Sequence, residues 1–518
     1  MVRKIILVCI CILLSQTSCQ TKQFSSPSNP SSKKVIMIMV DSMTDELLQT
    51  SLQEGVFPAL RFLMENGQVY NDLVAPFPSM SVTIEATLIT GQMPNEHKIP
   101  GLTWYDSKED RIIDYGTSIE TLRKLGVKES LEDAFYHLNN THLSQESKTI
   151  FEELHENGKT TGSINLLLHR GKTKHELDTP FILEKTIGID DKVETYGPDI
   201  FSYGSFHRPN VLQNELLSDA LILRAGFTDN YATEVITELM QHDNQPDFLL
   251  AFFPEMDKKT HRNAPPYISG FKEVDQHIKR ILDMYEDWND ALEDNIFILF
   301  GDHGQDALAE EESLAKIDLH SLYSRYNIAK FTEEPSSGDI VISNNHRMAY
   351  IEPVKDGISK LDIAKTGIQE ERIALTAYLQ DDMVYVWSPD FSESLTFSKG
   401  SEWTDSYGQK WNVSGNLDVL KVKQNIKEKT ITFTDYPDAF NQLWSALKSQ
   451  PNSVVITGKP GYVVFSETAP VHNGGGEHGG LHKNDTHASL IIAGTDKQPP
   501  SLRMVDLKSY ILNLIEEN

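Results

Sequence analysis

The chain has 518 residues, of which 39% are apolar and 24% charged, and its 30 glycines and 23 prolines are spread along its length. This composition is typical of a globular protein with a sizeable buried core, and it excludes disordered, collagen-like and disulfide-stapled classes. The 75 acidic and 47 basic side chains give a net charge of −28, which repels polyanions and argues against nucleic-acid binding. An anionic substrate would therefore need a local cation.

The first 34 residues predict a leader followed by a tether. Arg3 and Lys4 precede an apolar run at 5–14, which is too short to span a bilayer, and small residues then lead to Cys19. We expect residues 1–18 to be a secretory leader, Cys19 to be lipidated, and the Ser/Pro-rich residues 19–34 to tether the protein outside the cytoplasm to a bacterial membrane. Without lipidation the protein would be secreted.

Cysteine occurs only in this leader region. All three cysteines lie within the first 19 residues, so the remainder of the chain has no thiol for disulfides or for Cys-type zinc sites.

Apolar runs alternate with helical patterns through the first half of the chain. The runs at 35–40, 248–253 and 296–300 predict strands buried on both faces. Helical patterns at 57–64, 231–240 and 274–285 lie between them. The alternation predicts an α/β fold with a central, mostly parallel sheet covered by helices on both faces.

The pattern changes at about residue 310. Strand-like segments at 339–342 and 383–387, with a helix-like stretch at 358–366, predict a smaller α+β insertion or cap over 310–450. Runs at 453–456 and 489–493 and a helix from about 505 are expected to return to the core. The catalytic core would then comprise residues 35–309 and 451–518.

Acidic and imidazole side chains follow the core strands, where parallel sheets carry their functional sites. Mixed Asp/His ligands suit zinc or a similar first-row metal, and two metals about 4 Å apart can clamp the attacking and leaving oxygens of a phosphoryl displacement. An aspartate after a strand is more often a helix cap, so only the whole set predicts a metal centre. The set consists of Asp41, Asp257, His261, Asp302, His303 and His478.

A hydroxyl side chain supplies the predicted nucleophile. A helix over 82–89, ended by Gly91, places Ser81 at its N-cap. The positive end of the helix favours an alkoxide and a phosphate bound to it. Ser81 could instead serve only as a cap, and Ser79 and Thr83 are the neighbouring alternatives.

Taken in order, these segments resemble the alkaline phosphatase superfamily, and more closely its type I phosphodiesterase/nucleotide pyrophosphatase branch. The matching segments are 40–41, 78–81 with 90–97, 255–261, 302–304 and 477–479. The resemblance implies a zinc ion held by Asp41, Ser81, Asp302 and His303. It also implies a second zinc ion held by Asp257, His261 and His478, with His482 and His487 as alternatives to the last ligand.

The resemblance also implies a reaction. Ser81, where the branch usually has Thr, would attack the phosphorus of a small-molecule phosphoester and form a phosphoseryl intermediate that water hydrolyses. No histidine general base is needed, and no obligate protein partner is evident.

One substitution departs from the branch. The branch usually has an Asn that contacts a nonbridging phosphate oxygen, and the matching position here is Leu102. Thr103 is a substitute donor, and Arg170 resembles the position where some phosphatases of the superfamily contact phosphate, although an ordinary surface cation fits it equally well. The choice between monoester and diester substrates stays open.

Other functions fit the residues less well. A sulfatase would need Pro and Arg after its catalytic residue, and residues 81–85 contain neither. Phosphomutases use related metal residues, and phosphoethanolamine transferases normally have several membrane spans. A lipoprotein that keeps the fold but only binds a ligand or polymer would not need the complete ligand set.

Overall fold

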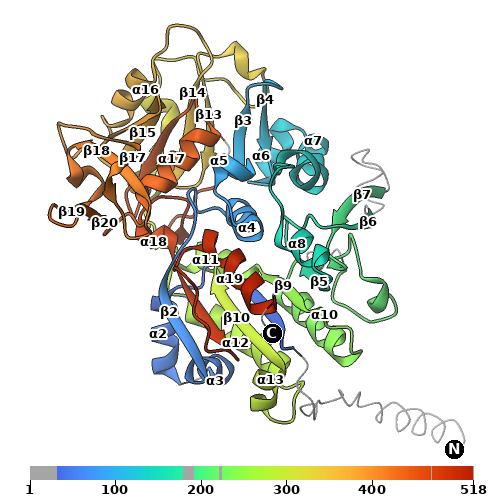
Figure 1. The fold of residues 1–518 in the computed structure, drawn as a ribbon. Coiled ribbons are helices and arrows are strands. Elements are labelled where there is room, and N and C mark those ends of the chain that lie inside the picture. Colours follow the sequence, from blue (N-terminus) through green and yellow to red (C-terminus); the bar gives the residue numbers. More distant parts are fainter. Residues whose placement is uncertain (1–31, 56, 179–191, 221–224, 468, 517–518) are drawn as a thin grey trace, which may run out of the picture.

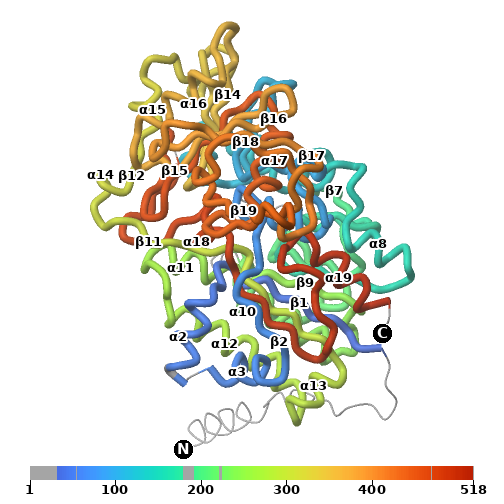
Figure 2. The backbone as a smooth tube through the Cα atoms, turned by 60° about the vertical axis from the view of Figure 1, so that its left-hand side comes forward, coloured from blue at the N-terminus to red at the C-terminus, as the bar shows by residue number. Residues whose placement is uncertain are grey.

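The computed structural model describes residues 32–55, 57–178, 192–220, 225–467 and 469–516. The predicted leader, Cys19 and nearly all of the predicted tether lie outside the described residues. In the described part of the chain, no helix combines the length and apolarity needed to cross a bilayer. Figures 1 and 2 show two α/β parts, each built on its own large sheet, that meet near α11 (Glu255–Asn263) and α18 (Lys483–Thr486).

A seven-stranded sheet forms the first part, in the order β2-β24-β10-β1-β9-β5-β8. The five strands from β10 to β8 run parallel, and β24 runs antiparallel to both of its neighbours. The α/β class with a mostly parallel sheet is thus confirmed. The strands are β1 (Lys34–Val40), β2 (Gly67–Val74), β5 (Thr161–Ile164), β8 (Ile200–Ser202), β9 (Phe248–Phe253), β10 (Asn295–Gly301) and β24 (His487–Ala493).

Helices cover both faces of this sheet, as predicted. Along β1, Val35, Met37 and Met39 pack on one face, and the residues between them pack on the other. Both sets are fully buried, which explains why the strand is an unbroken apolar run. One face is covered by α4 (Ser81–Thr90), α8 (Ile150–Glu156) and α19 (Met504–Glu516), and the other by α3 (Pro58–Glu65), α10 (Asp229–Gln241) and α12 (Ile268–Leu282).

A nine-stranded sheet forms the second part, and β18 pairs beside the main path. Helix α16 (Lys360–Gly367) packs on one face and α17 (Ala439–Ser449) on the other. The predicted strands at 339–342 and 383–387 and the helix at 358–366 all lie here. The strands are β13 (Ile340–Asn345), β14 (Met348–Pro353), β15 (Ile373–Gln380), β16 (Met383–Trp387), β17 (Leu395–Thr404), β18 (Lys410–Gly415), β19 (Lys423–Asn425), β20 (Thr430–Thr432) and β21 (Val454–Gly458).

The position of β21 corrects one expectation. We expected the run at 453–456 to return to the core sheet, but β21 lies between β14 and β15 in the second sheet. An unbroken apolar run indicates only that a strand is buried on both faces, and the second sheet, with helices on both faces, provides that environment as well as the core does. Of the late segments, β24 and α19 do pack in the core part.

Shorter elements connect the two parts and lie on their surfaces. The short helices are α2 (Asp45–Glu54), α5 (Pro94–His97), α6 (Ile119–Leu125), α7 (Val127–Glu132), α13 (Trp288–Asp294), α14 (Glu312–Ala315) and α15 (Leu319–Leu322). The small paired strands are β3 (Thr103–Asp106) with β4 (Arg111–Asp114), β6 (Thr173–Asp178) with β7 (Lys192–Gly197), and β12 (Lys316–Asp318) with β22 (Val463–Phe465).

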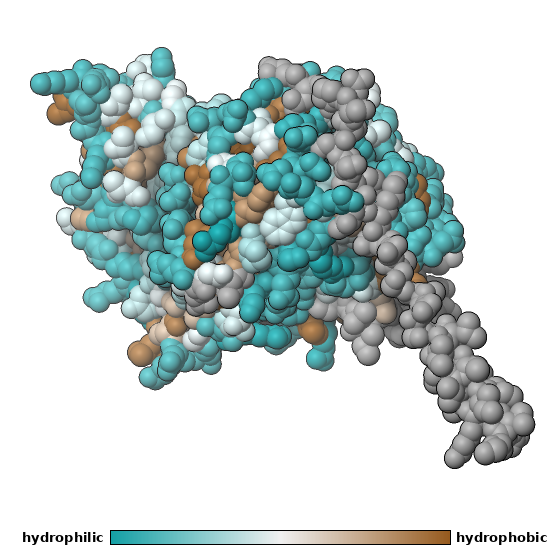
Figure 3. Space-filling view, turned by 90° about the horizontal axis from the view of Figure 1, so that it is seen from below, coloured by the Kyte–Doolittle hydropathy of each residue, from teal (hydrophilic) through white to brown (hydrophobic). Residues whose placement is uncertain are grey.

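The surface agrees with the acidic composition. Figure 3 shows one face of the molecule, where hydrophilic side chains predominate and apolar ones are scattered in small groups. Single exposed apolar side chains of this kind are ordinary for a globular protein.

Candidate metal centre and active site

The seven predicted ligands come together at the carboxyl ends of the core strands. The parallel register sets Val40, the last residue of β1, beside both Gly301 and Phe253, so the segments that follow these three strands meet. We call the seven predicted ligands the ligand cluster. They are Asp41 after β1, Ser81 at the start of α4, Asp257 and His261 on α11 (Glu255–Asn263), Asp302 and His303 after β10, and His478 after β23 (Gly476–Glu477).

The first half of the cluster surrounds Ser81. Its Oγ donates a hydrogen bond to Asp302 Oδ2 at 3.0 Å. His303 Nε2 lies 3.4 Å from Asp41 Oδ1 and 3.6 Å from Asp302 Oδ2. Met80 is the N-cap of α4, so Ser81 is its first helical residue and not the predicted cap. The shift of one residue leaves the hydroxyl at the positive end of the helix.

The second half of the cluster surrounds Asp257. The four-residue spacing to His261 lies on a helix, where residues i and i+4 share a face. Asp257 Oδ1 lies 3.2 Å from His261 Nε2 and 3.7 Å from His478 Nε2. The rings of His303 and His478 stack in parallel with centroids 3.7 Å apart, so the two halves adjoin.

The buried oxygen and nitrogen atoms of the cluster are suited to ligate divalent cations. Asp41 Oδ1 and His303 Nε2 are both buried without a hydrogen-bond partner, although each carries a lone pair. Burial and the neighbouring carboxylates of Asp302 and Asp257 raise the pKa of Asp41 well above its ordinary value. Three carboxylates in one buried site repel one another, and bound cations would remove that repulsion.

Electrostatics in the second half also indicate positive charge. Burial lowers the pKa of His261, but the adjacent Asp257 carboxylate outweighs this effect and raises the pKa to about 9. Burial alone would raise the pKa of Asp257, yet His261 holds it well below its ordinary value. A cation between them would take the place of that proton.

Close backbone contacts fix the segments that carry the ligands. Ser42, directly after Asp41, has a positive φ of 64°, and its N–H donates to Asp302 Oδ1 at 2.9 Å. A Cβ on Gly301 would come within 2.1 Å of Met43 O, and a Cβ on Gly475 within 1.8 Å of His261 O. Only glycine therefore allows the β10 and β23 segments to approach their neighbours so closely.

The predicted substrate contacts, Thr103 and Arg170, are bonded to other groups. Thr103 Oγ1 donates to Asp114 Oδ2 at 2.6 Å and is buried. The Arg170 guanidinium donates to the carbonyls of Leu143 and Ser144, each at 3.1 Å, and lies 3.5 Å from Glu152. Arg170 is therefore no ordinary surface cation, and the bonds of both residues favour a structural role.

The alternative ligands and nucleophiles also have other contacts. His482 is the N-cap of α18 (Lys483–Thr486), and His487 begins β24. Ser79 Oγ donates to Gly480 O at 3.2 Å and accepts from Gly479 N at 3.1 Å, so it holds the loop that carries His478. Thr83 is buried within α4.

Several residues that contact the cluster were not predicted. Ser42 Oγ and Gln305 Nε2 both donate to Asp257 Oδ1. His346 and His472 bond to Glu477, the residue before His478. Glu477 enters the sequence prediction only as part of a matching segment. His346 lies in the segment predicted as the insertion, and nothing near it in the sequence indicates a metal ligand.

The α/β core with aspartates and histidines at its strand ends defines a protein of the alkaline phosphatase superfamily. More specifically, the chain belongs to the type I phosphodiesterase/nucleotide pyrophosphatase family, whose model matches residues 35–480. The chain is thus a phosphoester hydrolase.

Solved structures share this fold at low sequence identity. Murine ectonucleotide pyrophosphatase/phosphodiesterase 5 is 14% identical with a TM-score of 0.55, covering 93% of this chain and 95% of that chain. Phosphonoacetate hydrolase from Sinorhizobium meliloti 1021 is 13% identical with a TM-score of 0.54, covering 95% of this chain and 100% of that chain. A comparison with curated protein sequences gives no match.

Proposed function

We propose that the chain is a dizinc phosphoester hydrolase with Ser81 as its nucleophile. One observation carries the proposal. The Ser81 hydroxyl, at the first residue of α4, is hydrogen-bonded at 3.0 Å to Asp302, and two buried atoms without hydrogen-bond partners, Asp41 Oδ1 and His303 Nε2, lie in the same half of the cluster. One zinc ion would be held by Asp41, Ser81, Asp302 and His303. The other would be held by Asp257, His261 and His478.

The chain's own residues would divide the reaction between them. Asp302 Oδ2 orients the Ser81 hydroxyl by accepting its hydrogen bond, and the hydroxyl proton passes to solvent as the oxygen attacks phosphorus. The departing ester oxygen takes up a proton from solvent. The new Oγ–P bond forms as the ester P–O bond breaks, and the N-terminus of α4 favours the negative charge that develops. Water then cleaves the phosphoserine and restores the hydroxyl. The zinc ions, when bound, would lower the pKa of the Ser81 hydroxyl and stabilise the negative charge on the leaving oxygen.

The substrate would be a small phosphorus oxyanion. Solved relatives are described in complex with AMP, for the murine protein, and with phosphonoformate, for the bacterial one. The net charge of −28 gives long-range repulsion for such ligands, so the cations of the site would have to provide the attraction.

The test compares hydrolysis of a nitrophenyl phosphomonoester and of the corresponding diester by residues 20–518, with zinc or with a chelator. Wild-type protein should turn over at least one substrate only with metal. Ser81→Ala should fold and retain metal but lose about 10³-fold or more in turnover, as expected when a covalent nucleophile is removed. Ser79→Ala is the comparison: it removes the neighbouring hydroxyl and its hydrogen bonds to the loop that carries His478, and it should lose far less turnover than Ser81→Ala.

Each outcome has a definite meaning. The faster substrate decides whether Leu102 in place of asparagine has moved the preference from diesters to monoesters. Full activity of Ser81→Ala would refute Ser81 as nucleophile. An absence of turnover by metal-loaded wild-type protein on both substrates would favour the ligand-binding alternative.

We also propose that the full chain is extracytoplasmic and anchored through lipid on Cys19. The leader-like residues 1–18 and the small residues before Cys19 support this proposal. Expression of the full chain in a bacterium fed labelled palmitate should label wild type and leave Cys19→Ala unlabelled. Equal labelling of both would contradict it.

A further inference from the structure

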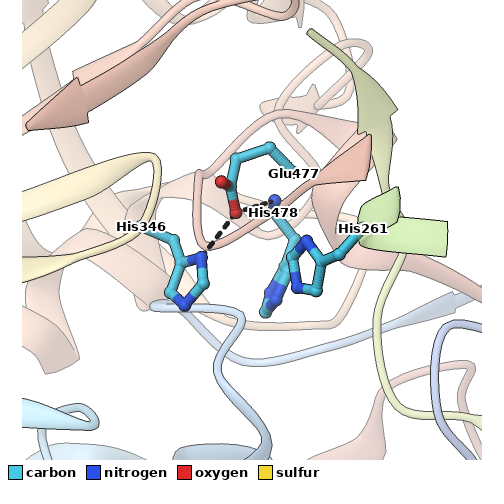
Figure 4. A group of neighbouring side chains, drawn as sticks. All are labelled: His261, His346, Glu477 and His478. Carbon is cyan, nitrogen blue, oxygen red and sulfur yellow. Dashed lines mark hydrogen bonds and ion pairs between the residues drawn. The ribbon is translucent and has the colours of Figure 1, made fainter. Parts of the chain in front are cut away.

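The second sheet places a histidine beside the ligand cluster. His346 occupies the turn between β13 and β14, and Figure 4 shows it beside Glu477, His478 and His261. The turn is held against the His478 loop, because Arg347 N donates to His478 O at 2.9 Å. The side chain is only 7% exposed. His346 is therefore fixed next to the ligand cluster.

The hydrogen bonds of His346 match those of the two neighbouring predicted ligands. Nδ1 of His261 bonds to Gly476 O at 2.7 Å, and Nδ1 of His478 bonds to Ser79 O at 2.8 Å. Nδ1 of His346 bonds to Glu477 Oε1 at 2.5 Å. Metal-binding histidines usually donate one ring N–H to a carbonyl or carboxylate in this way, which leaves the other nitrogen free for the metal.

The ring spacing also fits one shared metal. With metal–nitrogen bonds of about 2.0–2.1 Å in tetrahedral geometry, the ring centroids of two histidine ligands lie about 5 Å apart. The centroid distances are 5.3 Å for His261 and His478, 5.6 Å for His261 and His346, and 4.9 Å for His346 and His478. Ligand atoms of these three residues and Glu477 all lie within 4.8 Å of one another. Asp257 is not part of that group and adjoins it through Oδ1, which lies 3.2 Å from His261 Nε2 and 3.7 Å from His478 Nε2.

His472 does not fit in the same way. Its ring centroid lies 3.8 Å from that of His261, too close for both rings to share a tetrahedral metal. Its Nδ1 bonds to Glu477 Oε2 at 3.0 Å, while His346 bonds to the other oxygen. Glu477 is thus an acceptor held by two histidines, one at each oxygen.

We propose that His346 is a further ligand of the metal held by Asp257, His261 and His478, with Glu477 fixing the orientation of its ring. The proposal rests on the dizinc function proposed above. It gives this metal four protein ligands, so a substrate oxygen would be added as a fifth ligand. The second sheet then takes part directly in metal binding.

The number of histidine ligands can be counted in the wild-type protein. With cobalt(II) loaded into both sites, each ligating imidazole contributes one strongly shifted, exchangeable proton NMR signal from its buried Nδ1–H. We expect four signals, from His261, His303, His346 and His478, and three after His346→Gln. Three signals in the wild type, with two cobalt ions bound, would overturn the proposal and leave the dizinc function intact.

Metal affinity gives a second readout. Competition with a chromophoric chelator measures the zinc affinity of each site. His346→Gln should lower the affinity of one of the two sites by about 100-fold, because loss of a residue that only supports a ligand already costs up to about 100-fold. The matched variant His472→Gln removes the other partner of Glu477 and should weaken binding by a smaller factor than His346→Gln. Equal zinc affinities of wild type and His346→Gln would overturn the proposal. A wild-type chain that binds no second zinc would refute the proposed function as well.

Discussion

Replacing Glu85 by glutamine should remove a steep dependence of stability on pH. Glu85 lies on α4 one turn after Ser81, is fully buried, and accepts one hydrogen bond, from Leu168 N at 2.7 Å, while its Oε1 has no partner. Burial raises its pKa from an ordinary value of 4.5 to about 8. The folded chain therefore keeps a proton that the unfolded chain loses, and this contribution to stability is lost as the pH rises from 4.5 to about 8.

The magnitude follows from that difference in pKa. At about 1.4 kcal/mol per pH unit, the full effect is about 5 kcal/mol, and about 3.5 kcal/mol of it falls between pH 5 and pH 8. Glutamine resembles the protonated carboxyl and does not titrate. The free energy of unfolding of Glu85→Gln, relative to wild type, should therefore rise by about 3.5 kcal/mol between these two pH values.

Urea unfolding of both proteins at pH 5 and pH 8 measures this change. All other titrating groups are common to the two proteins and cancel in the comparison. Glu65→Gln, at an exposed position of α3, controls for the removal of a carboxylate in general. A stability difference between Glu85→Gln and wild type that is the same at both pH values would refute the reasoning.

Three further predictions concern the metal centre and its support. When free zinc is at a thousand times its Kd, stripping it with a chelator should lower the free energy of unfolding by about 4 kcal/mol per site. Calorimetry would detect this loss as a lower Tm, and an unchanged Tm would argue against bound metal. His478→Ala should lower the zinc content measured by atomic absorption, whereas His482→Ala should not. The opposite result would make His482, and not His478, the zinc ligand. Burial raises the pKa of Asp485 to about 7, so at pH 8 it is a carboxylate. At that pH Arg347→Met should cost about 3–5 kcal/mol in urea unfolding, because it removes the cation beside the buried Asp485 and leaves this side chain with the hydrogen bond from Gly480 N. A loss below about 1 kcal/mol would show that Asp485 is buried as the neutral acid.

The core sheet and most of the ligand cluster could be predicted from local sequence. The runs at 248–253 and 296–300 match β9 and β10 within one residue at each end, and the Asp/His pairs follow them directly. This works because a parallel strand buried on both faces has an unmistakable composition and its carboxyl end is where ligands gather.

Other features depend on contacts that local sequence does not encode. The run at 453–456 has the same composition as a core strand, so only pairing with β14 and β15 assigns β21 to the second sheet. His346 is more than a hundred residues from Glu477, and nothing near it in sequence indicates a metal site. The bonds of Arg170 to the carbonyls at 143 and 144 likewise form only in the folded chain.

The position of β24 has a consequence for the order of folding. This strand lies between β2 and β10 in the core sheet, yet it begins at His487, far along the chain from the end of β10 at Gly301. Until it is synthesised, β2 and β10 have an open gap between them, with apolar β10 as an unpaired edge. A growing chain therefore cannot complete its core sheet until β24 has left the ribosome, long after β10 has been synthesised.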